Sequence, residues 1–423
     1  WIITEENFMK DYSNIVSYLK LRGSVGKTGS QNLGAYDWRT LMGSATYNGA
    51  AGIVPSSLGN DILQWEEQIQ KEVGLDYGFW DDRIRGTLGY YQKKVDNLLY
   101  SDPVPTSSSF SSVYQNIGSL KNRGIEFDVR VDIIKNVQKD LTWNVDFNIA
   151  RNRTTLEKLN SSDGYFGGGA YDYFKIEEGG ETGRFYGYKD AGRLFMTNEE
   201  LVGLKTIDPK TGTLKYYRDD YNYERQGDVY IMDLDGDGQI TADGDRTVIG
   251  NANPDFFGGF GSTLYWKGLM LNAVFSYSVG GDRFWDEEKN SSGDMNVYNT
   301  SNRILDSWTV NPGVNASYPR AMYYGWGSNS IITDRYIHDA SYLRMTALNL
   351  SYRLPKHLYK NSILNAVEFT FQATNLFTWT KYPGMDPQGN FSTTYSAFYN
   401  MGIDYSTYPS ARTYNFGIKL TLK

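Results

Sequence analysis

Apolar and polar residues alternate with a period of two along the stretches of this chain in which a period can be read. Around 125–133, the apolar positions are Ile125, Phe127, Val129, Val131 and Ile133, and the positions between them are Glu126, Asp128, Arg130 and Asp132. After a turn at 134–140, the same pattern returns with Leu141, Trp143, Val145, Phe147 and Ile149 alternating with Thr142, Asn144, Asp146 and Asn148. A period of two predicts strands with one apolar and one polar face. The two stretches therefore predict a hairpin.

Strand length and connection length together favour a barrel. Similar alternation occurs at 19–25, 269–277, 367–373 and 414–422, and we expect about a dozen strands in all. The clearest are about ten residues long, as a tilted membrane-crossing strand requires, whereas ordinary strands have about 5–6. The connections at 159–254, 281–337 and 383–409 are long, whereas that at 134–140 is short. This asymmetry predicts an all-β fold, a transmembrane antiparallel β-barrel with long extracellular loops.

The composition excludes several kinds of site and argues against one class of partner. The chain has 423 residues with 35 Tyr, 20 Phe, 10 Trp and 44 Gly, and its mean hydropathy is −0.52. It has no cysteine, which excludes thiolate metal sites and cysteine nucleophiles, and only two histidines. The net charge of −7 argues against a nucleic-acid partner. The first twelve residues lack the features of a signal peptide, so we expect the sequence to begin inside a domain.

The segment GDVYIMDLDGDGQITADGDR (227–246) resembles the opening of an EF-hand calcium loop. Asp233, Asp235 and Asp237 fall at loop positions 1, 3 and 5, Gln239 at position 7 can offer its carbonyl, and Asp245 lies one residue beyond position 12. A solvated acidic loop that binds no ion is the alternative interpretation. We predict a structural Ca²⁺ site at these five residues, one that stiffens an outward-facing connection.

Two other groups of residues are candidates for contact with a substrate. Aromatic residues lie among glycines in the long connections: Tyr171, Tyr173, Tyr323, Tyr324 and Trp326. Their rings could stack on sugars or peptide side chains, although packing between loops or an aromatic girdle explains a single such ring more simply. Four acids should face the lumen: Glu126, Asp128, Asp132 and Asp146. They could line a substrate path or form a salt-bridged wall.

Several blocks resemble SusC/RagA-type TonB-dependent outer-membrane transporters. These blocks include QNIGSLKNRGIEFDV, the 227–271 segment, ASYLRMTALNLSYRLP, ATNLFTWTKYPGMDP and YPSARTYNFGIKLTL. They extend from near Leu19 to Leu422 in the family order. The resemblance implies that 1–423 form the C-terminal part of a 22-stranded barrel, without the N-terminal plug and the first strands. Because half a barrel would leave unpaired edges in lipid, we expect an N-terminal portion to complete it.

The resemblance also implies a function and partners. It implies active import of oligosaccharides or oligopeptides across the Gram-negative outer membrane, without an enzymatic reaction. The implied partners are a SusD-like surface lipoprotein, the TonB–ExbB–ExbD complex acting through the N-terminal part, and membrane lipid. Two alternatives remain open: a secreted all-β, calcium-stabilised carbohydrate-binding or adhesive module, and a β-rich glycoside hydrolase.

Overall fold

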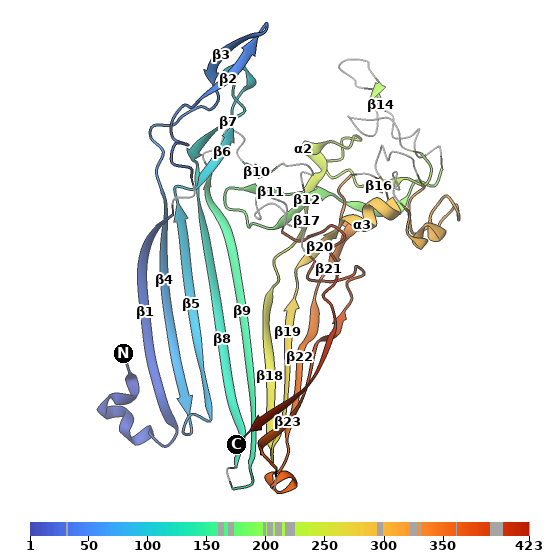
Figure 1. Ribbon diagram of the computed structural model, residues 1–423. Helices are drawn as coiled ribbons and strands as arrows, with labels where there is room; N and C mark the ends of the chain where they lie inside the picture. The colour runs from blue at the N-terminus through green and yellow to red at the C-terminus, as the bar shows by residue number, and fades with distance from the viewer. Residues whose placement is uncertain are drawn as a thin grey trace.

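A computed structural model describes residues 1–422 except 31–32, 137, 160–164, 168–172, 198–199, 201–205, 208–213, 216–224, 294–298, 322–328, 330, 361 and 390–400. Its main feature is one curved antiparallel sheet of 10 strands (Figure 1). In spatial order the strands are β1 (Val16–Ser30), β4 (Glu66–Phe79), β5 (Ile84–Asp96), β8 (Gly118–Asn136), β9 (Leu141–Leu159), β18 (Phe256–Trp266), β19 (Leu269–Val279), β22 (Tyr342–Arg353), β23 (Leu364–Thr380) and β25 (Thr413–Leu422). Each strand pairs with the next long strand along the chain, as in an up-and-down barrel.

The connections differ sharply between the two ends of the sheet. At one end the turns are short, and the β18–β19 turn contains only Lys267 and Gly268, both at positive φ. Positive φ at both central residues is typical of a type I′ hairpin turn. At the other end lie the three predicted long connections, together with two of intermediate length, 31–65 and 97–117. By analogy with membrane barrels, the long-loop end is the outer end.

Shorter elements fill the connections at the outer end (Figure 1). The paired short strands are β2 (Met42–Tyr47) with β3 (Ala50–Pro55), β6 (Leu99–Pro103) with β7 (Ser112–Asn116), β10 (Tyr165–Gly167) with β11 (Lys175–Glu177), β12 (Arg184–Tyr188) with β17 (Arg246–Asn251), β13 (Asp190–Leu194) with β16 (Val229–Ile231), and β14 (Thr206–Ile207) with β15 (Leu214–Lys215). A three-stranded sheet joins β20 (Asp282–Trp285), β21 (Ile337–Asp339) and β24 (Ile403–Asp404). The loops are thus folded structures in their own right.

The described helical segments are all short. The α-helices are α2 (Ala242–Asp245) and α3 (Asp286–Glu288), followed by a π-helical turn, η4 (Lys289–Gly293). The 3₁₀ turns are η1 (Ile3–Glu5), η2 (Asn7–Tyr12), η3 (Thr106–Ser108), η5 (Asn302–Asp306), η6 (Asp334–Tyr336) and η7 (Lys356–Tyr359). Within the described part of the chain, no helix has the length and apolarity to cross a membrane.

The pairing register confirms the alternation along most of the predicted hairpin. Val129 lies opposite Phe147, and Phe127 lies opposite Ile149, so the apolar residues share one face. The expected pattern fails at its last apolar position. A bulge between Asp132 and Ile134 makes Ile134, not Ile133, the partner of Trp143. A bulge inserts one unpaired residue and so shifts which later side chains share a face.

Candidate functional site

The described parts of connections 160–255, 280–341 and 381–412 form a folded unit at the outer end, here called the loop cap. One core consists of Tyr173, Phe174, Phe185, Ile249, Ala252, Phe284, Tyr336 and Ile403. A second consists of Leu194, Phe195, Val229, Ile231 and Ile240. Segments far apart in sequence supply these side chains, so burial of apolar area holds the connections in one arrangement. The loop cap is therefore a scaffold on which a site can be built.

The acidic loop lies between β16 and α2, beside the second core. The carboxylate of Asp233 accepts the backbone N–H of Gly236 at 2.7 Å and that of Gly238 at 2.8 Å. Both glycines have positive φ, which lets the chain turn around this carboxylate. Ile240, the apolar residue at loop position 8, is buried in the second core. The sequence thus folds into a tight turn anchored at both ends.

Three of the predicted metal ligands come together in this turn. One carboxylate oxygen from each of Asp233, Asp235 and Asp237 lies within 4.8 Å of the others. Because Ca²⁺ binds oxygens at about 2.3–2.6 Å, oxygens this close can share one ion. The carboxylates of Asp235 and Asp237 are exposed, so an ion can reach them. The donor set therefore fits a hard divalent cation.

Asp245 and Gln239 have different surroundings. Asp245 is fully buried, and its two oxygens accept the backbone N–H groups of Leu234 and Thr241, each at 2.7 Å. It lies outside the group of three carboxylates, and its contacts fix the two sides of the loop to each other. Gln239 donates its backbone N–H to Asp237 at 2.8 Å. Its role as a carbonyl ligand, and that of Asp245 in closing the site, stay predictions.

Only one of the five candidate aromatic residues falls in the described part of the chain. Tyr171, Tyr323, Tyr324 and Trp326 lie outside the described residues. Tyr173 belongs to the first core, where its ring centroid is 4.7 Å from that of Phe284 and its hydroxyl donates to Asp286 at 2.8 Å. A ring enclosed in this way packs the loop cap and does not offer a face to a substrate.

The four acids expected in the lumen lie on the polar face of the sheet, and several are paired there. Asp128 accepts the backbone N–H of Thr87 at 2.8 Å, and Asp132 lies 3.5 Å from the guanidinium of Arg85. Glu126 lines a cavity of about 300 Å³ with Arg22, Glu72 and Lys93 among its neighbours. The simpler of the two interpretations, a hydrated and salt-bridged wall, accounts for the ion pair of Asp132, while Asp128 is held by hydrogen bonds from Thr87.

Sequence reasoning missed the buried charges that join the loop cap to the sheet. Arg344, at the outer end of β22, donates to Asp386 and to Gln388, each at 2.6 Å. Burial alone would raise the pKa of the Asp386 carboxyl. The hydrogen bonds from Arg344 and from the backbone of Gln388 and Ser410 outweigh burial and hold that pKa below its ordinary value. No local motif joins residues 42 positions apart, so the pattern could not reveal this pair.

A second buried charge organises the interior of the loop cap. Asp228 is fully buried, lies 2.7 Å from the guanidinium of Arg320, and accepts from Asn329 at 2.8 Å. Burial raises the pKa of Asp228, and the contact with Arg320 opposes that effect. Asn329 in turn accepts the backbone N–H of Val229, in the second core. This network therefore positions the strand that leads into the acidic loop.

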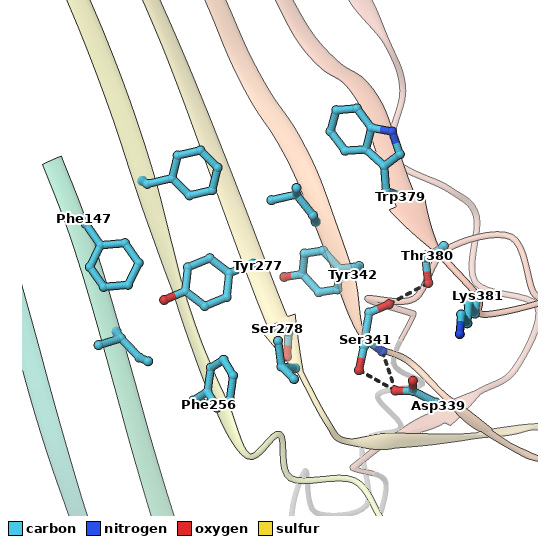
Figure 2. A pocket seen from close by; sticks show the side chains of 14 residues that line it. Phe147, Phe256, Tyr277, Ser278, Asp339, Ser341, Tyr342, Trp379, Thr380 and Lys381 are labelled. Atoms are coloured by element: carbon cyan, nitrogen blue, oxygen red, sulfur yellow. Dashed lines mark hydrogen bonds between the residues drawn. The ribbon is translucent and has the colours of Figure 1, made fainter. Parts of the chain in front are cut away.

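The apolar face of the sheet carries an aromatic groove of about 710 Å³ near the outer end (Figure 2). Its apolar lining residues are Phe147, Ile149, Phe256, Phe260, Tyr277, Val279, Leu343 and Trp379. Polar residues, among them Asp339 and Lys381, line the part of the groove nearest the loop cap. Aromatic rings at the boundary between an apolar band and polar groups are typical of the interface girdle of a membrane barrel.

An exposed apolar face, a polar opposite face, short turns at one end and folded loops at the other define an outer-membrane β-barrel protein. Residues 12–321 match the family described as TonB dependent receptor-like, beta-barrel. The chain belongs to this family. It is accordingly an outer-membrane protein of this receptor family and not an enzyme, which leaves the secreted module and the glycoside hydrolase without support.

Relatives cover nearly the whole chain. It is 32% identical to TonB-dependent receptor P3 of Formosa agariphila, over 99% of this chain and 41% of that protein. It is 30% identical to TonB-dependent receptor SusC of Bacteroides thetaiotaomicron, over 99% of this chain and 39% of that protein. The solved RagAB peptide transporter superimposes with a TM-score of 0.74 at 26% identity, over 99% of this chain and 42% of that one. The expected SusC/RagA relationship is thus confirmed, and the chain spans about two fifths of these relatives' length.

Proposed function

We propose that this chain forms part of the barrel wall, together with the loop cap, of a TonB-dependent importer. The imported nutrients are oligomers, either oligosaccharides or oligopeptides. The observation that carries the proposal is the amphipathic ten-stranded sheet with a folded cap at one end. This arrangement is similar to that of the RagAB peptide transporter over 99% of this chain. A polar inner wall suits passage of hydrated solutes, and the cap provides a surface on which they can be held. By the same proposal, a TonB–ExbB–ExbD complex supplies the energy.

The proposal includes a SusD-like lipoprotein that covers the loop cap. The 159–254 connection is the proposed contact because it is the longest and because both of its described ends are anchored in the cap cores. A rigid surface loses little entropy when a partner docks on it. The contact can be tested by co-purifying the intact transporter with its lipoprotein and cross-linking from single cysteines placed in this connection. Cross-links confined to other connections would contradict the assignment.

Uptake by cells tests the transport function itself. Cells lacking the intact transporter should fail to accumulate labelled oligosaccharides or labelled oligopeptides, and the restored gene should rescue one of these two classes. Loss of ExbB should abolish the rescued uptake. Uptake that persists without ExbB would rule out the energy-coupled mechanism, while rescue of neither class would rule out the proposed substrates. The class that is rescued identifies the substrate.

We also propose that the acidic loop binds Ca²⁺ through Asp233, Asp235 and Asp237, with the Gln239 carbonyl and Asp245 as the further expected ligands. The three carboxylates repel one another, and a hard cation relieves that repulsion. Binding would stabilise the loop cap by about 2.7 kcal/mol at a concentration a hundred times the Kd. The ion has a structural role in this proposal, since it holds a connection already anchored by Ile240.

Protection from a protease tests the calcium proposal in the intact transporter. Chelation should speed cleavage within the loop cap, and added Ca²⁺ should restore protection. Asp235→Asn removes one negative charge from the group of three carboxylates and should therefore abolish the effect of Ca²⁺. The Asn side chain can still accept the backbone N–H of Asp237, so the turn itself is kept. Asp243→Asn is the matched control, as this exposed acid of α2 lies outside the group of three. Cleavage that is indifferent to chelation would contradict the proposal.

A further inference from the structure

Basic residues form two rows on the apolar face of β1 to β9, directly beyond the outer end of the apolar band. Register places them: Lys71 pairs with Gln92, Gln92 with Arg123, and Ile125 with Arg151, all on the face that carries Val73, Leu88 and Phe127. On β9, Arg151 follows Ile149 at the next position of the same face. The apolar stretch from Leu141 to Ile149 is about 27 Å long at 3.4 Å per residue, so Arg151 lies where a tilted strand leaves the hydrocarbon.

The upper row is neutralised by acids on the same face. Lys27 lies 2.8 Å from Glu67, Lys94 lies 2.9 Å from Asp96, and Lys121 lies 3.1 Å from Glu157. At the level of the lower row, Arg153 pairs in register with Arg123, and its charge is neutralised by Asp255 at 3.1 Å. All of these cations already have partners, so the upper row has little net charge.

The other cations of the lower row are different. Lys71, Arg123 and Arg151 are all exposed, and none forms an ion pair with any residue in the described part of the chain. Lys71 and Arg123 are two strands apart, a separation of about 10 Å. Arg123 and Arg151 are diagonal neighbours on paired strands, about 7–8 Å apart. Three unpaired cations at the level of the lipid headgroups make a site for anions.

The aromatic groove begins next to these cations. Ile149, two residues before Arg151 on β9, is one of its lining residues, and Phe147 lies one position further down the same face. The groove opens on the face that contacts lipid, and rings cover much of its floor (Figure 2). Lys381 adds a cation and Asp339 an acid at the far end, where Asp339 accepts the backbone N–H of Ser341 at 2.9 Å.

We propose that this surface binds a phosphate-bearing, multiply acylated lipid of the outer leaflet. Lys71, Arg123 and Arg151 hold the phosphate groups, and the groove beside them takes an acyl chain. Phosphate groups supply the negative charge that would neutralise Lys71, Arg123 and Arg151. The groove offers apolar area where an acyl chain descends from the headgroup. A soluble anion would use the cations alone and would leave the groove unexplained, so the combination favours a lipid.

Native mass spectrometry of the intact transporter tests the proposal, with bisphosphorylated hexa-acyl lipid A as the probe. The triple variant K71Q/R123Q/R151Q should retain this lipid about a hundredfold less than the unmodified protein, since each of the three basic residues near an anionic headgroup contributes about 1 kcal/mol. The control R130Q/K93Q removes two cations from the opposite face and should retain lipid fully. Equal retention by the triple variant, or equal loss by the control, would overturn the proposal.

A second measurement does not depend on any variant. The unmodified transporter should retain less lipid when dephosphorylated lipid A of the same acylation replaces the probe. Inorganic phosphate should not displace the bound phosphorylated lipid. Equal binding of both lipids would show that acyl chains alone are recognised. Complete displacement by inorganic phosphate would assign the cations to a soluble anion. Either result would contradict the assignment of a phosphorylated lipid.

Discussion

The sheet and the loop cap use apolar residues in opposite ways. On the sheet, large apolar side chains are exposed: Val73 by 57% and Ile125 by 53% of their area. In the loop cap, Phe185 and Phe284 are both 0% exposed, and the chain closes around them. Each arrangement is stable only in its own solvent, lipid for the sheet and water for the cap. The same residue types therefore predict different consequences of mutation in the two regions.

The largest expected effect is in the first core of the loop cap. Phe284→Ala removes a ring that contacts Tyr173, Phe185 and Tyr336, and it should destabilise the cap by about 3–5 kcal/mol. Hydrogen exchange of cap amides in the intact transporter should accelerate, while heat-dependent gel mobility of the barrel should persist. If barrel and cap lost stability together, they would not be the separate regions described here.

The next effect concerns the lipid-facing side of the sheet. Val129 lies opposite Phe147 midway along the apolar band, and Val129→Arg should cost about 2–4 kcal/mol in barrel stability. Asn144→Arg is the matched control, because Asn144 is on the polar face opposite Asp132. Urea unfolding in lipid vesicles measures both. A penalty for the control as large as that for Val129→Arg would mean that the two faces are assigned wrongly.

The smallest effect is a pH dependence where cap and sheet meet. The pKa of Asp386 is lowered in the folded protein, so its pairing with Arg344 stabilises the fold above the unfolded pKa of about 3.9. That stability should be lost as pH falls below about 4 and through the folded pKa. Hydrogen exchange around 386–389 should rise over this window. Asp386→Asn should remove the pH response, and a response of undiminished size in this variant would assign it to other carboxylates.

Local patterns determined the strands of this protein and the acidic loop. The period of two depends only on successive side chains pointing to opposite faces, so Phe127 and Val129 could be assigned to one face without knowledge of any partner strand. The loop with Asp233, Asp235 and Asp237 was equally visible, because its ligands are two residues apart. Where the local period is interrupted, as at the bulge near Ile133, the same reasoning fails, since pairing with β9 decides the register.

Only the tertiary structure decided which distant residues meet. The sequence offered Tyr173 as a candidate for substrate contact, yet its hydroxyl donates to Asp286, 113 positions away, in a buried core. Asp228 and Arg320 are 92 positions apart and form one buried charge pair. The cations of the lower row become a surface only when strands β4, β5, β8 and β9 pair in register. Such contacts depend on chain crossings and register, which no local pattern encodes, whereas faces and turns follow from neighbouring residues alone.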